Sequence, residues 1–274
     1  MTDRVRASDS EPAGGESVDL YLEAEGPVAW LVLNRPNKRN AVTFAMWQRL
    51  PELLTTFEES REQKVLVMRG AGNRAFSAGA DISEFETYRA TSEDTQAYNE
   101  AAEKAQDLLA AMSKPTIALV QGACVGGGCG LAMSCDIRFS DRSARFAITP
   151  ARLGIVYPVN VTKRLVDLVG PAQAKSMLYT GMTVDAERAY QLGLVNELFD
   201  ETTIEADTVA FAQTIAERAQ YSVRGTKRIV DLISAGLSEE SEETLTLRAG
   251  SFDTADYREG VRAFLEKRPA VFKD

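Results

Sequence analysis

The 274-residue sequence contains no histidine. Histidine is the side chain whose ordinary pKa lies closest to neutrality, and it is the usual base of Ser-His-Asp and Cys-His sites. Its absence excludes every mechanism that needs imidazole as a base, an acid or a metal ligand. Any catalysis must therefore depend on carboxylates, tyrosine, lysine, cysteine or the backbone.

Long apolar runs are missing as well. The sequence has no apolar core of a secretory signal peptide and no stretch long enough to span a bilayer. We therefore expect a cytoplasmic protein with no membrane partner.

Basic residues are outnumbered, because 31 Lys and Arg stand against 40 Asp and Glu, which gives a net charge of −9. That balance argues against a nucleic-acid partner.

Cysteine is scarce and clustered. The chain has three cysteines, Cys124, Cys129 and Cys135, and their spacing matches no common zinc pattern. We interpret them as small buried thiols and predict no metal site.

The order of strand-like and helix-like segments indicates an α/β protein. The first 17 residues are polar and are predicted to form a disordered arm, followed by an α/β core over residues 18–200 and a helical region over residues 201–274. Strand-like runs at Val28–Leu33, Val65–Arg69 and Thr116–Val120 alternate with helix-like segments. Parallel pairing follows from this alternation, and the loops after the second and third strands are expected at one sheet edge.

A glycine-rich segment follows the third of these strands. Residues 122–136 read GACVGGGCGLAMSCD, and Gly126, Gly127 and Gly128 stand where a helix is predicted to begin. The first amides of a helix have no partner within it and carry partial positive charge, so such a place can bind an anion or a developing oxyanion. The alternative interpretation is that the glycines only allow close packing of helix against sheet.

Three segments together resemble the crotonase family, also called the enoyl-CoA hydratase/isomerase superfamily. They are residues 76–82 (FSAGADI), the stretch from Lys114 to Asp136, and residues 256–268, and the resemblance covers about residues 18–273. It implies a crotonase-like spiral of ββα units and a helical C-terminal region that makes trimers or hexamers. It also implies an acyl-CoA thioester as the ligand, with coenzyme A as part of the substrate and no separate cofactor.

The resemblance assigns expected roles to individual positions. The amides that hold the thioester oxygen fall on Ala80 and Gly127, where fixed donors would stabilise the charge of an enolate as it forms. Coenzyme A is expected to contact six residues in the first half of the chain and two residues near the C-terminus that approach from a neighbouring region or subunit. These residues are Lys38, Arg39, Ala41, Ala78, Asp81, Ile82, Phe264 and Lys267.

The sequence departs from the family at the two glutamates that activate water in its hydratases. Gly130 and Ala151 occupy these positions, and no glutamate occurs between Lys104 and Ala186. Hydration needs a proton taken from water and another delivered to carbon, which is work for carboxyl groups. We interpret the acids closest in sequence, Asp136, Asp141 and Asp167, as structural.

One segment is similar to the TP-x-x-LG-x-x-Y pattern of methylmalonyl-CoA decarboxylases in the same superfamily. By that similarity Thr149 and Tyr157 would orient a substrate carboxylate, although Thr149 ending a strand and Tyr157 packing beside Pro158 is the plain alternative. The first hypothesis is therefore an acyl-CoA lyase that forms a thioester enolate at Ala80 and Gly127, with decarboxylation or another glutamate-independent step at Thr149 and Tyr157. The alternatives are an enoyl-CoA hydratase or isomerase of fatty-acid metabolism, and a non-catalytic acyl-CoA-binding protein.

Overall fold

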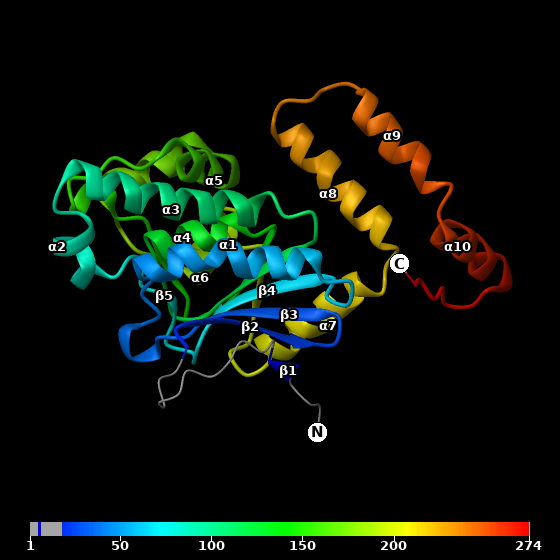
Figure 1. Ribbon diagram of the computed structural model, residues 1–274, viewed down its shortest axis with the longest axis horizontal. Helices are drawn as coiled ribbons and strands as arrows, with labels where there is room; N and C mark the ends of the chain where they lie inside the picture. The colour runs from blue at the N-terminus through cyan, green and yellow to red at the C-terminus, as the bar shows by residue number, and fades with distance from the viewer. Residues whose placement is uncertain (1–4, 7–17, 274) are drawn as a thin grey trace.

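Two β-sheets and a set of helices make up the computed structural model, which describes residues 5–6 and 18–273 (Figure 1). The larger sheet contains, in spatial order, β1 (Val5–Arg6), β2 (Leu20–Glu25), β3 (Val28–Leu33), β4 (Val65–Gly70), β6 (Thr116–Val120), β8 (Ile137–Asp141) and β11 (Glu197–Phe199). The smaller sheet contains β10 (Val184–Asp185), β9 (Arg145–Ala147), β7 (Ala123–Val125) and β5 (Ala75–Ser77).

The helices lie between these strands and after the last of them. They are α1 (Phe44–Glu59), α2 (Phe85–Tyr88), α3 (Ser92–Ala110), α4 (Gly127–Ser134), α5 (Val159–Thr180), α6 (Ala186–Gln191), α7 (Ile204–Ala216), α8 (Gln220–Ser234), α9 (Glu242–Ser251) and α10 (Ala255–Glu266), with short 3-10 turns at Pro36–Lys38, Ile82–Glu84 and Pro150–Arg152. A strand of the large sheet, a strand of the small sheet and a helix recur in that order from β4, from β6 and from β8. The expected ββα spiral is therefore confirmed.

Alternation along the central strands builds two apolar cores. In β3, Ala29, Leu31 and Leu33 face one side of the large sheet, and Val28, Trp30 and Val32 face the other. The first core is shared with α1, α3, α4 and α5, and the second is covered by α7 (Figure 1). Central parallel strands read as unbroken apolar runs because both of their faces are buried.

The C-terminal helices divide differently from the expected boundary at residue 201. Ile204, Ala212 and Ala216 of α7 are buried in the second core, so this helix belongs to the packing of the sheet. The helices that project from the body are α8, α9 and α10 (Figure 1). Of the stretch predicted as a disordered arm, Val5–Arg6 pairs antiparallel with β2, and the remainder lies outside the described residues.

One prediction about the core is confirmed. The three cysteines are free and buried, as expected. In the part of the chain that the structure describes, no helix is long and apolar enough to cross a membrane.

Candidate active site

A cavity of about 270 Å³ lies where β5, β7 and β9 end. These three strands are parallel neighbours in the small sheet, so the residues that follow them emerge at one edge. Ala80 follows β5, Gly127 follows β7, Thr149 follows β9, and all three line the cavity. The sequence predicted a shared edge for loops of the large sheet. The edge that gathers the site belongs to the small sheet, whose three-residue strands were not all foreseen.

Two backbone amides border this cavity, those of Ala80 and Gly127. Ala80 forms a parallel bridge with Val42, in which Gly79 and Asp81 make the hydrogen bonds at 2.8 and 3.0 Å. The amide of Ala80 itself therefore points away from Val42. Gly127 is the first residue of α4, where an amide has no partner within the helix. Neither amide donates a hydrogen bond to an acceptor among the described residues.

The two amides are close in space. A Cβ atom built on Gly127 would lie 3.9 Å from the Ala80 nitrogen, and one built on Gly79 would lie 3.4 Å from the Gly127 nitrogen. Donors so placed on rigid backbone can hold one oxygen atom that gains negative charge. The structure thus brings together the two positions that the sequence singled out.

The glycines around these amides have different structural roles. Gly126 has φ 54° and ψ −121°, a conformation that favours glycine. Gly128 is helical, but a Cβ there would lie 2.5 Å from Ser77 Cβ and 2.8 Å from the Ser77 carbonyl oxygen. The close-packing interpretation therefore holds for Gly128, and it is compatible with the anion-site interpretation of Gly127. Helix α4 begins at Gly127, within the glycine run where a helix was predicted to begin.

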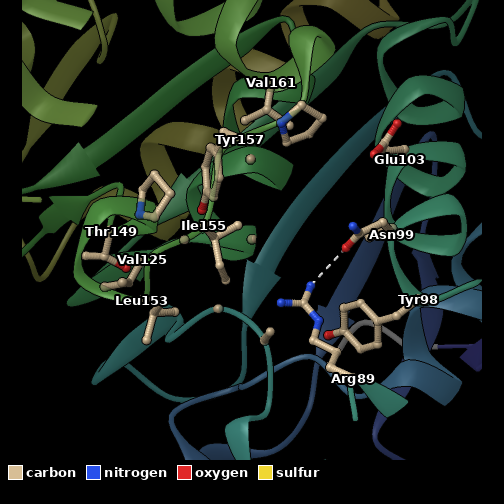
Figure 2. Close-up of a pocket in the computed structure, with 18 of the residues that line it drawn as sticks. Arg89, Tyr98, Asn99, Glu103, Val125, Thr149, Leu153, Ile155, Tyr157 and Val161 are labelled. Carbon is tan, nitrogen blue, oxygen red and sulfur yellow. Dashed lines mark hydrogen bonds between the residues drawn. The ribbon is translucent and has the colours of Figure 1, made fainter. Parts of the chain in front are cut away.

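Thr149 and Tyr157 both line the cavity (Figure 2). Thr149 precedes the 3-10 turn at Pro150–Arg152, yet its side chain does not cap that turn. The described residues provide no hydrogen-bond partner for either hydroxyl group. The Tyr157 hydroxyl lies 3.5 Å from the Cβ position of Gly126, and burial raises the pKa of this phenol. Tyr157 also packs against the apolar core, as its interpretation as a packing residue expected, while its side chain borders the cavity.

Gly130 and Ala151, which stand where the family's hydratases have glutamates, lie in different surroundings. Gly130 lines the cavity, and a Cβ built there would lie 3.0 Å from Gln106 Oε1 and 3.1 Å from Gln106 Nε2. The carboxamide of Gln106 thus fills the space into which a side chain at residue 130 would extend. Ala151 is exposed and is not among the described residues that line the cavity.

A polar face of α3 forms another wall of the cavity, which was not predicted from the sequence. Asn99, Glu103 and Gln106 line the cavity at the i, i+4, i+7 spacing of one helix face, and Figure 2 shows Asn99 and Glu103 on this helix. Burial raises the pKa of Glu103, and the charges of Asp107 and Glu100 raise it further. Glu103 is the one carboxylate among the described residues that line the cavity, and Arg89 is the one cation.

The loop at residues 38–41 lies beside the loop after β5. The Ala78 amide donates to the Arg39 carbonyl at 2.9 Å, and Arg35 donates both to the Ala41 carbonyl and to Asp81 at 2.8 Å. Burial alone would raise the pKa of Asp81, but its hydrogen bonds with Ser83 and Arg35 outweigh burial and lower it. These contacts hold the two loops together as a single rim.

The residues expected to contact coenzyme A are divided between this rim and the C-terminal helices. Ala78 and Ile82 line the cavity, whereas Lys38 and Arg39 are exposed beside it. Phe264 and Lys267 lie on and just after α10, which projects from the body well away from α2 and α3 (Figure 1). Within one chain they are not brought to the cavity.

The neighbouring acids are structural, as predicted. Asp136 accepts hydrogen bonds from the Thr116 amide and from Lys227, and Asp141 accepts from Gln121 and Ser143. Asp167 forms an exposed ion pair with Lys163 on the same helix. None of the three lines the cavity in the described part of the chain.

Comparison with known proteins gives a consistent result. The family model described as enoyl-CoA hydratase/isomerase matches residues 23–274. The chain is 33% identical over 258 residues to a crotonyl-CoA hydratase of Syntrophomonas wolfei, covering 93% of this chain and 97% of that protein. It is 35% identical over 248 residues to a mitochondrial enoyl-CoA hydratase of Pongo abelii, covering 90% of this chain and 84% of that protein.

Solved structures agree. A putative enoyl-CoA hydratase/isomerase family protein from Hyphomonas neptunium superposes with a TM-score of 0.91 at 40% identity, covering 93% of this chain and 98% of that one. An enoyl-CoA hydratase/carnithine racemase from Magnetospirillum magneticum gives a TM-score of 0.89 at 36% identity, with coverage of 94% and 96%.

Proposed function

The chain belongs to the enoyl-CoA hydratase/isomerase family, and from this premise we propose that it is an enzyme that moves protons on an enoyl-CoA thioester. The proposal rests on one observation above all, the pair of unpartnered amides at Ala80 and Gly127. A thioester enolate carries its charge on the former carbonyl oxygen, and two fixed donors stabilise it as it forms. Loss of one such donor typically costs about 3 to 4 kcal/mol of barrier.

Glu103 is proposed as the proton-transferring group. The positions of both usual glutamates carry no carboxylate, and α3 instead supplies one carboxylate to the cavity. The raised pKa of Glu103 suits a group that must both accept and release a proton. This geometry supports the hydratase/isomerase alternative, with an acid brought in by the fold.

One carboxyl group can complete either family reaction. In isomerisation it takes a proton from the α-carbon of a β,γ-enoyl thioester and returns it to the γ-carbon as the double bond moves. In hydration it takes a proton from water as oxygen bonds to the β-carbon, and then delivers that proton to the α-carbon. In both reactions the amides of Ala80 and Gly127 hold the enolate oxygen between the two transfers.

Decarboxylation is a second candidate, favoured by the two unpartnered hydroxyl groups of Thr149 and Tyr157. Loss of CO₂ from a malonyl-type thioester leaves the same enolate and needs no base in its first step. Uncharged hydroxyl groups can orient the departing carboxylate without repelling it. The names of the relatives favour hydration over this reaction.

Coenzyme A binding and assembly belong to the same proposal. The rim formed by residues 38–41 and 78–82 is proposed to hold the adenine end of coenzyme A. Phe264 is 83% exposed, and neighbouring apolar residues of α10 are exposed with it. We propose that α10 meets another subunit in a trimer or hexamer, where Phe264 and Lys267 reach that subunit's coenzyme A. Light scattering of the purified protein measures the oligomer.

The test is a panel of three thioesters. Crotonyl-CoA reports hydration, a 3-enoyl-CoA reports isomerisation and methylmalonyl-CoA reports decarboxylation. We expect turnover of an enoyl-CoA that is lost in Glu103→Gln and retained in the control Glu93→Gln, an exposed residue in the first turn of α3. Turnover of methylmalonyl-CoA alone, lost in Tyr157→Phe, would establish the second candidate instead. Tight binding with no turnover would indicate a binding protein.

A further inference from the structure

Arg89 lines the cavity, and no carboxylate of the described residues forms an ion pair with it. It follows α2 directly, and its guanidinium carbon lies 4.3 Å from the centroid of the Tyr98 ring and 4.6 Å from that of Phe85. The two rings hold the side chain in place while its charged end borders the cavity (Figure 2). This side chain has no role in the proton transfers proposed above.

The hydrogen-bonding capacity of Arg89 is largely unused. A guanidinium carries five N–H donors. Within the described residues, Nη2 donates to Asn99 Oδ1 at 3.1 Å, Nε is buried without a partner, and no carboxylate lies within ion-pair distance. Arg35 and Arg164, by contrast, are paired with Asp81 and Asp107. The remaining donors of Arg89 are therefore available to bind an anion.

The charges around Arg89 leave this place open to an anion. Glu103 lies one turn beyond Asn99 on α3 and forms no ion pair with Arg89. Burial is the largest influence on the pKa of Tyr157 and raises it, while the charge of Arg89 acts in the opposite direction. The guanidinium is therefore within electrostatic reach of the Tyr157 side of the cavity, and Figure 2 shows the two residues on either side of the space.

A continuous wall leads from the oxyanion site to this cation. A Cβ built on Gly127 would lie 3.1 Å from the Trp47 ring, and Trp47 Nε1 donates to the Tyr98 hydroxyl at 2.9 Å. Tyr98 in turn lies under the Arg89 guanidinium. An acyl chain whose thioester oxygen is held at Gly127 can follow this aromatic wall, and its far end then meets Arg89.

We propose that Arg89 binds a carboxylate carried by the acyl group, so that the preferred substrates are coenzyme A thioesters of dicarboxylic acids. The inference rests on the proposed function, because it assumes a thioester held at Ala80 and Gly127. A guanidinium can take a carboxylate through two parallel hydrogen bonds, which fixes the orientation of the acyl chain as well as its charge. Asn99 holds the guanidinium plane for that contact.

The experiment measures binding by calorimetry, with saturated thioesters that cannot be hydrated. Three pairs of equal chain length are compared, namely butyryl-CoA with succinyl-CoA, pentanoyl-CoA with glutaryl-CoA, and hexanoyl-CoA with adipoyl-CoA. We expect at least one diacid thioester to bind about 10- to 100-fold more tightly than its partner, the range typical of a hydrogen-bonded charge. Arg89→Gln should abolish that preference, and Arg89→Lys should keep part of it.

Controls separate this inference from its alternatives. Arg152→Gln removes an exposed arginine of the Pro150–Arg152 turn and should leave the preference unchanged. A thermal melt of Arg89→Gln checks that the variant is folded. Equal weakening of both members of each pair would show that Arg89 binds the phosphates of coenzyme A, and would overturn the proposal. So would the lack of any diacid preference in a protein that still binds butyryl-CoA, whereas failure to bind any thioester would overturn the proposed function itself.

Discussion

The wall of the cavity that contains Ala80 and Gly127 presents backbone amides, whereas the wall formed by α2 and α3 presents the side chains of Arg89, Asn99 and Glu103. The first wall is fixed by strand pairing and by glycines that permit close approach. The second is fixed by which face of a helix turns toward the cavity. We infer that the backbone amides of the first wall stabilise the charge of the enolate. The side chains of the second wall select the substrate and transfer its protons.

The largest expected effect is on the side-chain wall. Glu103→Gln keeps the shape of the side chain but removes its ability to take a proton, so we expect kcat for enoyl-CoA turnover to fall by about 10²- to 10⁴-fold. Steady-state kinetics measures the fall, and KM should change little because the amide wall is intact. A fall of less than threefold would mean that the proton transfer is carried elsewhere.

The next effect is on the amide wall. Gly127→Pro removes one N–H donor at the first position of α4, where proline is otherwise well tolerated in helices. We expect kcat to fall by about 10²- to 10³-fold. Gly127→Ala is the matched control, since it keeps the donor and adds only a Cβ that presses on the Trp47 ring at 3.1 Å. If the alanine variant lost as much activity as the proline variant, crowding rather than the donor would be responsible.

The packing that supports the amide wall can be tested by thermal unfolding. In Gly128→Ala the new methyl group would meet the Ser77 backbone at 2.8 Å, and we expect a loss of about 1 to 3 kcal/mol of unfolding free energy. Gly225→Ala, in helix α8 with nothing within 4 Å of its Cβ, should be neutral or slightly stabilising. Equal melting temperatures for the two variants would contradict the close contact.

The smallest expected effect is a shift in the pH dependence of kcat/KM. Glu103 acts as a base only when ionised, and burial together with the charges of Asp107 and Glu100 raises its pKa. The acid limb of kcat/KM should therefore lie at higher pH than for an ordinary glutamate. Glu100→Gln removes one negative charge, lowers the pKa of Glu103 and should move the limb to lower pH. A limb that stays in place in this variant would assign the titration to another group.

The two walls also differ in how far the sequence could predict them. Ala80 and Gly127 were predicted from the resemblance of residues 76–82 and 114–136 to the crotonase family, and for Gly127 the glycines at the predicted helix start pointed to the same place. Glu103 was missed because Asn99, Glu103 and Gln106 form a polar stripe that, in sequence, looks like a solvent-exposed face of α3. Only the packing of Tyr98, Ala105 and Leu109 into the core decides that the stripe borders a cavity.

The small sheet was incompletely predicted for a related reason. Strands such as Ala75–Ser77 and Ala123–Val125 are too short to show an alternating pattern, and they exist because parallel neighbours pair with them. The position of Gly130 was predicted as one where a carboxylate is missing. The sequence could not predict that Gln106 fills the space beside Gly130, because Gln106 belongs to a helix that is distant in sequence.

We propose that Glu103 and the amides of Ala80 and Gly127 act together to convert a bound thioester into its enolate. Exchange of the α-protons of butyryl-CoA in D₂O, followed by NMR, tests it without depending on hydration, isomerisation or decarboxylation. We predict exchange catalysed by the wild-type protein, abolished in Glu103→Gln and strongly slowed in Gly127→Pro. Absence of exchange in a wild-type protein that binds butyryl-CoA, or exchange that survives in both variants, would contradict the account.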